Sequence, residues 1–357
     1  MPTLQCALLM APLEVRNEIY TLLIPSQFHM SLQGDSFCLA RCIEPRQDRD
    51  DKSRRHFVYD PPDALIRDED HYRIRADEVS TPLWALRLES TWGPHWKCKE
   101  AAINGSVESR FGVSLLLLCR RIQFEVIDLL CRTAEAHVTD METINYFHNP
   151  TLVLSTMPSI LPSLLQRVTQ LNITLRLPLP FFQRLERLED APSPDPELES
   201  LVQAWLSLGS SLRRFPNLRI VRFWLDHDKP DCWTTVNERT LLSPLARLFQ
   251  AQKIDVSFSL PHLHPKREQE NRQFIQGADL RFALHRRLRQ RYFRSSSTQG
   301  KVRIIFKATF PFLVDAIDLV EMTMAEIEEE ERSMWEVGLD VEDMIAGFLQ
   351  LPASMLE

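Results

Sequence analysis

Histidine, cysteine and aspartate side chains, the groups that bind metal ions or transfer protons, gather at two places in the second half of the chain. Asp226-His227-Asp228 comes directly after a predicted strand and is followed by Asp231 and Cys232. Metal ligands must converge on one point, and neighbouring residues cannot do so alone. We therefore interpret this run as an ordinary polar loop. His262 and His264 could share one side of an extended segment, but no third ligand stands near them.

The cysteines show no spacing typical of a metal site or a redox pair. Cys38 and Cys42 are four residues apart, and no second pair follows at zinc-finger spacing. No phosphate-binding glycine pattern, nucleophile elbow or H-E-x-x-H zinc motif occurs. The sequence therefore predicts no catalytic residue, no cofactor and no metal site. It predicts free thiols in a reducing compartment at Cys6, Cys38, Cys42, Cys98, Cys119, Cys131 and Cys232.

A basic run from Arg281 to Arg294 lies on a predicted helix, Phe274 to Phe293. Its guanidinium groups could contact nucleic-acid phosphates, and the residues that would do so are Arg286, Arg287, Arg289 and Arg291. The alternative is a solvated helix face that pairs with the acidic run Glu326 to Glu331. We favour the alternative, because 42 basic and 49 acidic residues give a net charge of −7, whereas a nucleic-acid binder needs a basic face.

The bulk composition is that of a soluble globular protein. Hydrophobic residues make up 44% and charged residues 25% of the 357 residues, which suffices for one large domain or two ordinary ones. Only 9 glycines occur, which argues against phosphate-binding loops. No apolar run is long enough to cross a membrane. The first ten residues lack the features of a secretory signal, so we expect an intracellular protein, cytoplasmic or nuclear.

Helical and strand patterns alternate from about residue 157 onward, which predicts an α/β fold with a mainly parallel sheet. A degenerate leucine-rich-like curved sheet is one form that such units could take. The predicted helix and strand pairs are 160–167 with 168–177, 196–212 with 218–225, 241–249 with 254–260, and 274–293 with 302–309.

Three regions follow from the changes in composition. Residues 1–150 form a helical region with a charged insertion at about 45–80, which we expect to be exposed. Residues 151–312 carry the helix–strand units. Residues 313–357 form an acidic helical segment.

Two amphipathic helices are predicted in the first region, at 12–24 and 115–130. In the first, Pro12 suits the first turn, and Val15, Ile19, Leu22 and Leu23 form an apolar stripe. In the second, apolar residues recur at helical spacing from Leu115 to Leu130.

These two helices carry patterns that resemble those of fungal F-box-like proteins. The first, L-M-A-P-L-E-V-R-N-E-I-Y-T-L-L, is similar to an opening of the form L-P-x-E-I-R-x-x-I-Y-x-x-L-L. The second, Leu115 to Cys131, is similar to L-L-x-V-C-R-Q-I-Y-x-E-A-x-x-L-L-Y, with Arg121, Gln123, Val126 and Cys131 as departures. The resemblance implies an F-box-like helical element packed on the helix–strand units. The long charged insertion departs from a compact F-box, which keeps its helices together.

The resemblance also implies a partner, a Skp1-like adaptor of a ubiquitin ligase. The adaptor-binding face would comprise Pro12, Leu13, Ile19, Leu22 and Leu23. The alternative, which we favour for these residues, is that the same face packs as core against 115–130. We expect a non-enzymatic intracellular scaffold for protein–protein interaction, with a substrate-recognition subunit as its specific form. A nucleic-acid-associated protein and a divergent enzyme remain the alternatives, and the oligomeric state is left open.

Overall fold

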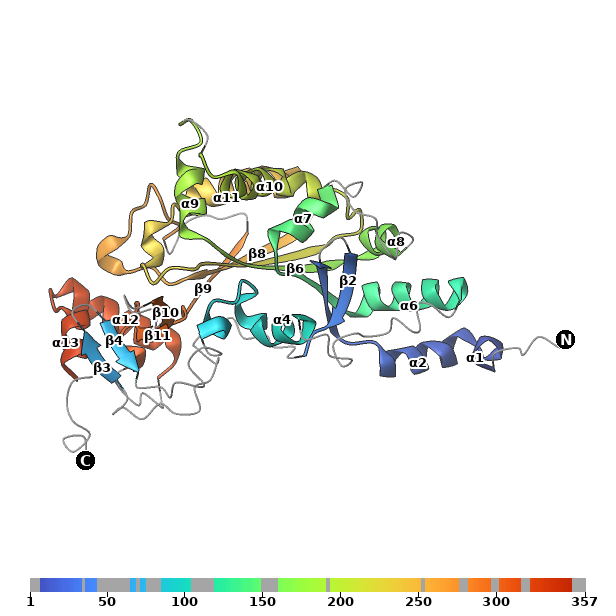
Figure 1. Cartoon of the computed structure of the whole chain (residues 1–357), viewed down its shortest axis with the longest axis horizontal. Coiled ribbons are helices and arrows are strands. Elements are labelled where there is room, and N and C mark those ends of the chain that lie inside the picture. The colour runs from blue at the N-terminus through green and yellow to red at the C-terminus, as the bar shows by residue number, and fades with distance from the viewer. Residues whose placement is uncertain are drawn as a thin grey trace, which may run out of the picture.

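The structure of the protein is a computed structural model. It describes residues 7–33, 36–43, 65–68, 71–74, 85–103, 119–148, 160–190, 193–251, 254–275, 282–296, 302–315 and 322–348. Within these ranges the chain forms one large sheet, one small sheet and helices packed on both (Figure 1).

The large sheet contains seven strands within the described residues, in the order β2-β1-β5-β6-β7-β8-β9. The strands β1 and β2 pair antiparallel, and every other neighbouring pair is parallel. The fold is therefore α/β with a mainly parallel sheet, as the alternation of elements predicts. The strand bounds are β1 (Gln27–Gln33), β2 (Ser36–Arg41), β5 (Glu135–Val138), β6 (Gln170–Leu177), β7 (Ile220–His227), β8 (Asp255–Pro261) and β9 (Ala283–Arg287).

Helices with clear start signals connect the parallel strands. The longest connecting helix begins after Asp195, whose carboxylate accepts hydrogen bonds from the backbone N–H groups of Glu197 and Leu198 at 2.9 and 3.3 Å. Pro196 occupies the first turn, where its missing N–H costs nothing. The connecting helices are α7 (Met141–His148), α8 (Ile160–Arg167), α9 (Leu179–Glu186), α10 (Pro196–Leu212) and α11 (Glu238–Ala251).

The two faces of the large sheet differ in chemistry, because successive side chains of a strand point to opposite sides. On one face, Leu171, Ile173 and Leu175 of β6 belong to the main hydrophobic core. The helices α7, α9, α10 and α11 lie along this side of the sheet (Figure 1). On the other face β6 carries Asn172 and Arg176, and η2 (Gly93–His95) and α4 (Trp96–Ile103) lie beside it. The buried polar side chains of His137, Asn172, Arg176 and Asp226 share this second face by strand register.

The small sheet joins distant parts of the sequence. Its antiparallel order is β10-β11-β4-β3, with β3 (Leu65–Asp68), β4 (His71–Ile74), β10 (Tyr292–Ser296) and β11 (Val302–Phe306). Two strands of the 45–80 insertion thus pair with the C-terminal third of the chain. The rest of that insertion lies outside the described residues.

The prediction of the fourth helix–strand unit, 274–293 with 302–309, is wrong. The strand that follows β8 in the large sheet is β9, inside the stretch expected to be the helix 274–293. The expected strand at 302–309 is β11, which belongs to the small sheet. Three η turns, η5 (Trp233–Thr235), η6 (Pro265–Arg267) and η7 (Leu313–Asp315), lie between the later elements.

The C-terminal segment packs at the end of the molecule that holds the small sheet (Figure 1). It contains α12 (Met324–Glu336) and α13 (Val341–Phe348). A capping box starts α12, since Thr323 and Glu326 exchange hydrogen bonds between side chain and backbone. Ile327, Trp335 and Ile345 form a core separate from the main one, with Phe310 and Phe312.

The N-terminal helices lie at the opposite end (Figure 1). They are α1 (Ala7–Met10), α2 (Leu13–Leu23) and α6 (Arg120–Thr133), and α2 packs beside α6. The first part of the predicted helix 115–130 lies outside the described residues. No helix in the described ranges is both long enough and apolar enough to cross a membrane.

Candidate protein-binding face and buried side-chain clusters

Polar side chains hold α2 against α6. The Arg16 guanidinium donates to both carboxylate oxygens of Glu125, from Nε to Oε2 at 2.8 Å and from Nη2 to Oε1 at 2.6 Å. The Tyr20 hydroxyl donates to Oε2 of the same carboxylate at 3.0 Å. Arg16 and Tyr20 are 2% and 0% exposed. The side of α2 that faces the protein is therefore the side that carries Arg16 and Tyr20.

The environment of this contact shifts the pKa values of Glu125 and Tyr20. The Arg16 guanidinium lowers the pKa of the Glu125 carboxyl to about 2, against the opposing effect of burial. Burial, together with the nearby Glu125 carboxylate, raises the pKa of the Tyr20 hydroxyl to about 12. At neutral pH the contact thus joins an ionised carboxylate, a guanidinium and a neutral phenol.

The apolar stripe of α2 faces outward. The exposed fraction is 86% for Leu22, 52% for Leu23, 45% for Leu13 and 37% for Ile19. Pro12 is exposed as well. The expectation that this face packs as core against 115–130 is therefore wrong. The helices α2 and α6 do pair, but the ion pair between Arg16 and Glu125 places the side of α2 that carries Arg16 and Tyr20 against the protein.

The basic run takes a form that the sequence did not predict. Arg287, Arg289 and Arg291 are 0%, 2% and 1% exposed, and the run forms β9 and its connection to β10 instead of a helix. Arg286 makes a bidentate ion pair with the buried Glu238 carboxylate, at 2.5 and 2.9 Å. Guanidinium groups held in this way cannot reach phosphates, which corrects the alternative of a nucleic-acid contact through these four residues.

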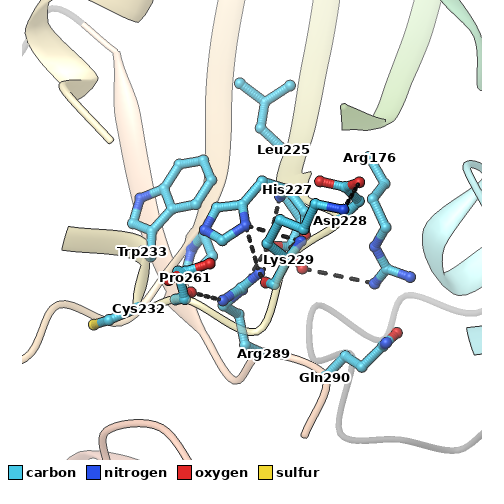
Figure 2. A network of polar contacts seen from close by, with 12 residues as sticks. Arg176, Leu225, His227, Asp228, Lys229, Cys232, Trp233, Pro261, Arg289 and Gln290 are labelled. Carbon is cyan, nitrogen blue, oxygen red and sulfur yellow. Dashed lines mark hydrogen bonds and ion pairs between the residues drawn. The ribbon is translucent and has the colours of Figure 1, made fainter. Parts of the chain in front are cut away.

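Asp226 lies at the centre of a buried charge network. Its Oδ1 accepts a hydrogen bond from Arg289 Nε at 2.7 Å, and its Oδ2 lies 3.6 Å from Arg176 Nη2 and 3.9 Å from Arg287 Nη2. Figure 2 shows Arg176 and Arg289 arriving from different elements. Burial would raise the pKa of the Asp226 carboxyl, but the three guanidinium groups hold it well below its usual range.

Arg289 also fastens the loop after β7. Its Nη2 donates to the carbonyl oxygens of His227 and Lys229 at 2.9 and 2.8 Å, and its Nη1 donates to the Asp231 carbonyl (Figure 2). Burial lowers the pKa of His227 well below its ordinary value, with help from the Arg289 charge. Asp226 and His227 form the end of β7, not part of the loop that the sequence predicts, and these contacts give the run 226–232 a structural role.

The other histidine pair of the sequence also meets protein partners. His262 Nδ1 lies 3.0 Å from Glu328 Oε2 on α12. His264 Nδ1 accepts a hydrogen bond from the Lys266 N–H at 3.2 Å. The His264 ring also lies 4.9 Å from the Trp335 ring, so both histidines contact α12.

A cluster of two cysteines and two histidines lies on the polar face of the large sheet. His29 of β1, Cys42 after β2, His95 of η2 and Cys98 of α4 are all buried. One ligand atom from each lies within 4.8 Å of those of the others. Cys42 Sγ is 3.5 Å from His95 Nδ1 and 3.8 Å from Cys98 Sγ. These four residues could hold one metal ion.

The short spacing of Cys38 and Cys42 in the sequence concealed this cluster, because Cys38 is not part of it. In the structure Cys38 lies on β2, opposite Ser31 of β1. One local feature of the sequence could have indicated the cluster. His95 and Cys98 are three residues apart at the start of a helix, and that spacing places two ligands on one face.

Comparisons of this chain with known proteins identify its family. A search of curated proteins and a search of solved structures each found no match. A model of a protein family matches residues 2–276, which include α2, α6, the first six strands of the large sheet and all four members of the cysteine–histidine cluster. The chain therefore belongs to the family described as a domain of unknown function, DUF7730.

Proposed function

We propose that the protein is a non-enzymatic intracellular scaffold that binds a partner protein through the exposed apolar face of α2. The observation that carries this proposal is the orientation of the helix. An amphipathic surface helix normally buries its apolar stripe and exposes its polar side. Here Arg16 and Tyr20 are buried, and Leu22 and Leu23 are exposed.

The exposed residues form a continuous surface. At about 3.6 residues per turn, Val15, Ile19 and Leu22 fall on one side of the helix, and Leu23 borders them. Val15 is 48% exposed. Leu13 lies nearer the side of Tyr20, at the edge of the stripe. A contiguous apolar patch of this kind is typical of a protein-binding surface.

The partner that we propose is a Skp1-like adaptor, and the protein would then be the substrate-recognition subunit of a ubiquitin ligase. Two features support this choice. The first helix resembles the opening of F-box-like proteins, and the residues expected to bind an adaptor are the exposed ones. The polar contact with Glu125 also holds the helix in one orientation, which lowers the entropic cost of binding.

Isothermal titration of a purified Skp1-like adaptor into the full chain tests the proposal. We expect saturable binding, and we expect Leu22→Glu to weaken it at least tenfold, or about 1.4 kcal/mol. Leu206→Glu is the matched control, because Leu206 is also exposed but lies on α10. The control should bind as the wild type does. Failure of the wild-type chain to bind, or equal loss in both variants, contradicts the proposal.

A further inference from the structure

Two distances in the cysteine–histidine cluster match those around a single tetrahedral zinc ion. Bonds of about 2.3 Å to sulfur and about 2.0–2.1 Å to nitrogen hold two sulfur ligands about 3.8 Å apart, and a sulfur and a nitrogen about 3.5–3.6 Å apart. The Cys42 and Cys98 sulfurs are 3.8 Å apart. The Cys42 sulfur and His95 Nδ1 are 3.5 Å apart.

The buried imidazole of His29 gives an independent reason to expect a ligand. The side chain is 0% exposed, and neither ring nitrogen makes a hydrogen bond of ordinary geometry; its polar neighbour is the Cys98 thiol, another member of the cluster. A buried polar atom without a partner destabilises the fold. The ring is held in place by the Trp92 ring, which stacks on it at 5.1 Å. Coordination of one nitrogen would satisfy an acceptor that the protein leaves without a partner.

We propose that His29, Cys42, His95 and Cys98 bind one zinc ion. Two thiolates and two neutral imidazoles form a tetrahedral S2N2 set, which selects zinc among the common metal ions. Binding displaces one proton from each thiol into solvent, and the two thiolates neutralise the charge of the ion. The filled site is electrically neutral, which suits its burial.

The zinc ion would have a structural role. All four ligands come from the protein, so the tetrahedral site has no open position for a substrate. Its ligands come from β1, from the residue after β2, from η2 and from α4. Zinc would thus fasten residues 92–103 onto the polar face of the large sheet. This inference does not depend on the adaptor contact, because the cluster and the apolar face of α2 share no residue.

Metal analysis of the full chain, purified from zinc-supplemented medium and dialysed, tests the site. We expect one zinc ion per chain, and near-complete loss of zinc in Cys42→Ser and in Cys98→Ser. Cys131→Ser is the matched control, because Cys131 is also a buried free thiol but lies on α6. The control should keep its zinc.

A second measurement on the wild-type chain covers the case in which the variants do not fold. Cobalt(II) exchanged into the folded chain should give thiolate charge-transfer bands and the visible bands of a tetrahedral site. A folded wild-type chain with neither zinc nor these cobalt bands overturns the proposal. Zinc that persists in both cysteine variants overturns it too, as does iron with acid-labile sulfide in place of zinc.

Discussion

The buried Arg16 guanidinium and the partly buried Glu125 carboxylate form a bidentate ion pair across 109 residues of sequence, with N–O distances of 2.8 and 2.6 Å. This pair joins α2 to α6. It also decides the orientation of α2, because the partner of Arg16 lies on the protein side. The same contact that pairs the helices therefore leaves the apolar stripe exposed.

Loss of the Glu125 carboxylate should destabilise the pairing of α2 with α6. Glu125→Gln removes the negative charge and one of the two acceptor oxygens that Arg16 and Tyr20 share, and it leaves a guanidinium buried without its counter-charge. We expect a clear fall in Tm by differential scanning calorimetry. Arg121→Gln removes only an exposed partner of the same carboxylate, so its Tm should stay near that of the wild type. Equal shifts in the two variants would contradict this assignment.

The same contact should weaken in acid. Folding lowers the pKa of the Glu125 carboxyl from 4.5 to about 2. The stabilisation is complete above the unfolded pKa and is lost as the pH falls through this interval. Between about pH 5 and about pH 3, the free energy of unfolding should therefore fall more steeply for the wild type than for Glu125→Gln. Urea denaturation over this range measures the difference, and parallel curves would refute it.

Truncation of neighbouring side chains should reveal the orientation of α2. Tyr20→Ala removes a fully buried ring and should cost about 3–5 kcal/mol of unfolding free energy. Leu22→Ala removes a side chain that is 86% exposed and should change stability by about 0.5 kcal/mol or less. Chemical denaturation measures both. A larger cost for Leu22→Ala than for Tyr20→Ala would mean that the helix is turned the other way.

Asp226 should be essential for stability. Asp226→Asn leaves Arg176, Arg287 and Arg289 buried around a neutral side chain, and breaking a buried charge network of this kind costs about 3–5 kcal/mol. Asp231→Asn is the control, because Asp231 is exposed and faces Arg289 with its backbone carbonyl. Urea unfolding should show a large loss for the first variant and little change for the second. Similar losses of stability in the two variants would contradict the assignment of this stabilisation to the Asp226 carboxylate.

A glycine beside the cysteine–histidine cluster should not tolerate a side chain. Gly93 has a φ of +50°, and a Cβ there would lie 2.7 Å from Cζ3 of Trp224. Gly338 also has a positive φ, but a Cβ there would meet no atom within 4 Å. Backbone strain of about 1–2 kcal/mol applies to alanine at both positions. Gly93→Ala should therefore lower the Tm more than Gly338→Ala does in thermal denaturation. An equal fall in Tm would show that the Trp224 ring moves to make room for the new methyl group.

The helices and strands with strong local signals were predictable from the sequence. The helix 160–167 coincides with α8 and the helix 196–212 with α10, whose Asp195 cap and Pro196 mark the start. The alternation of helices and strands also indicated the parallel sheet. These features depend mainly on residues close together in the sequence, so local sequence patterns predict them.

Features that depend on long-range contacts were not predictable. The stretch around Arg287 looked helical and solvated because its charges suggested a surface, but Asp226 and Glu238 bury those charges from more than 45 residues away. The orientation of α2 likewise depends on Glu125. The cysteine–histidine cluster draws on four separate elements, so only the spacing of His95 and Cys98 gave a local hint.

Hydrogen–deuterium exchange of the full chain, with and without a saturating purified Skp1-like adaptor, tests whether α2 binds the adaptor. We expect the adaptor to slow exchange in residues 13–23, because binding stabilises α2 against opening. The α10 segment, 196–212, should exchange at the same rate in both samples. Binding that leaves 13–23 unchanged, or no binding at all, would contradict the claim that the exposed face of α2 is the adaptor-binding surface.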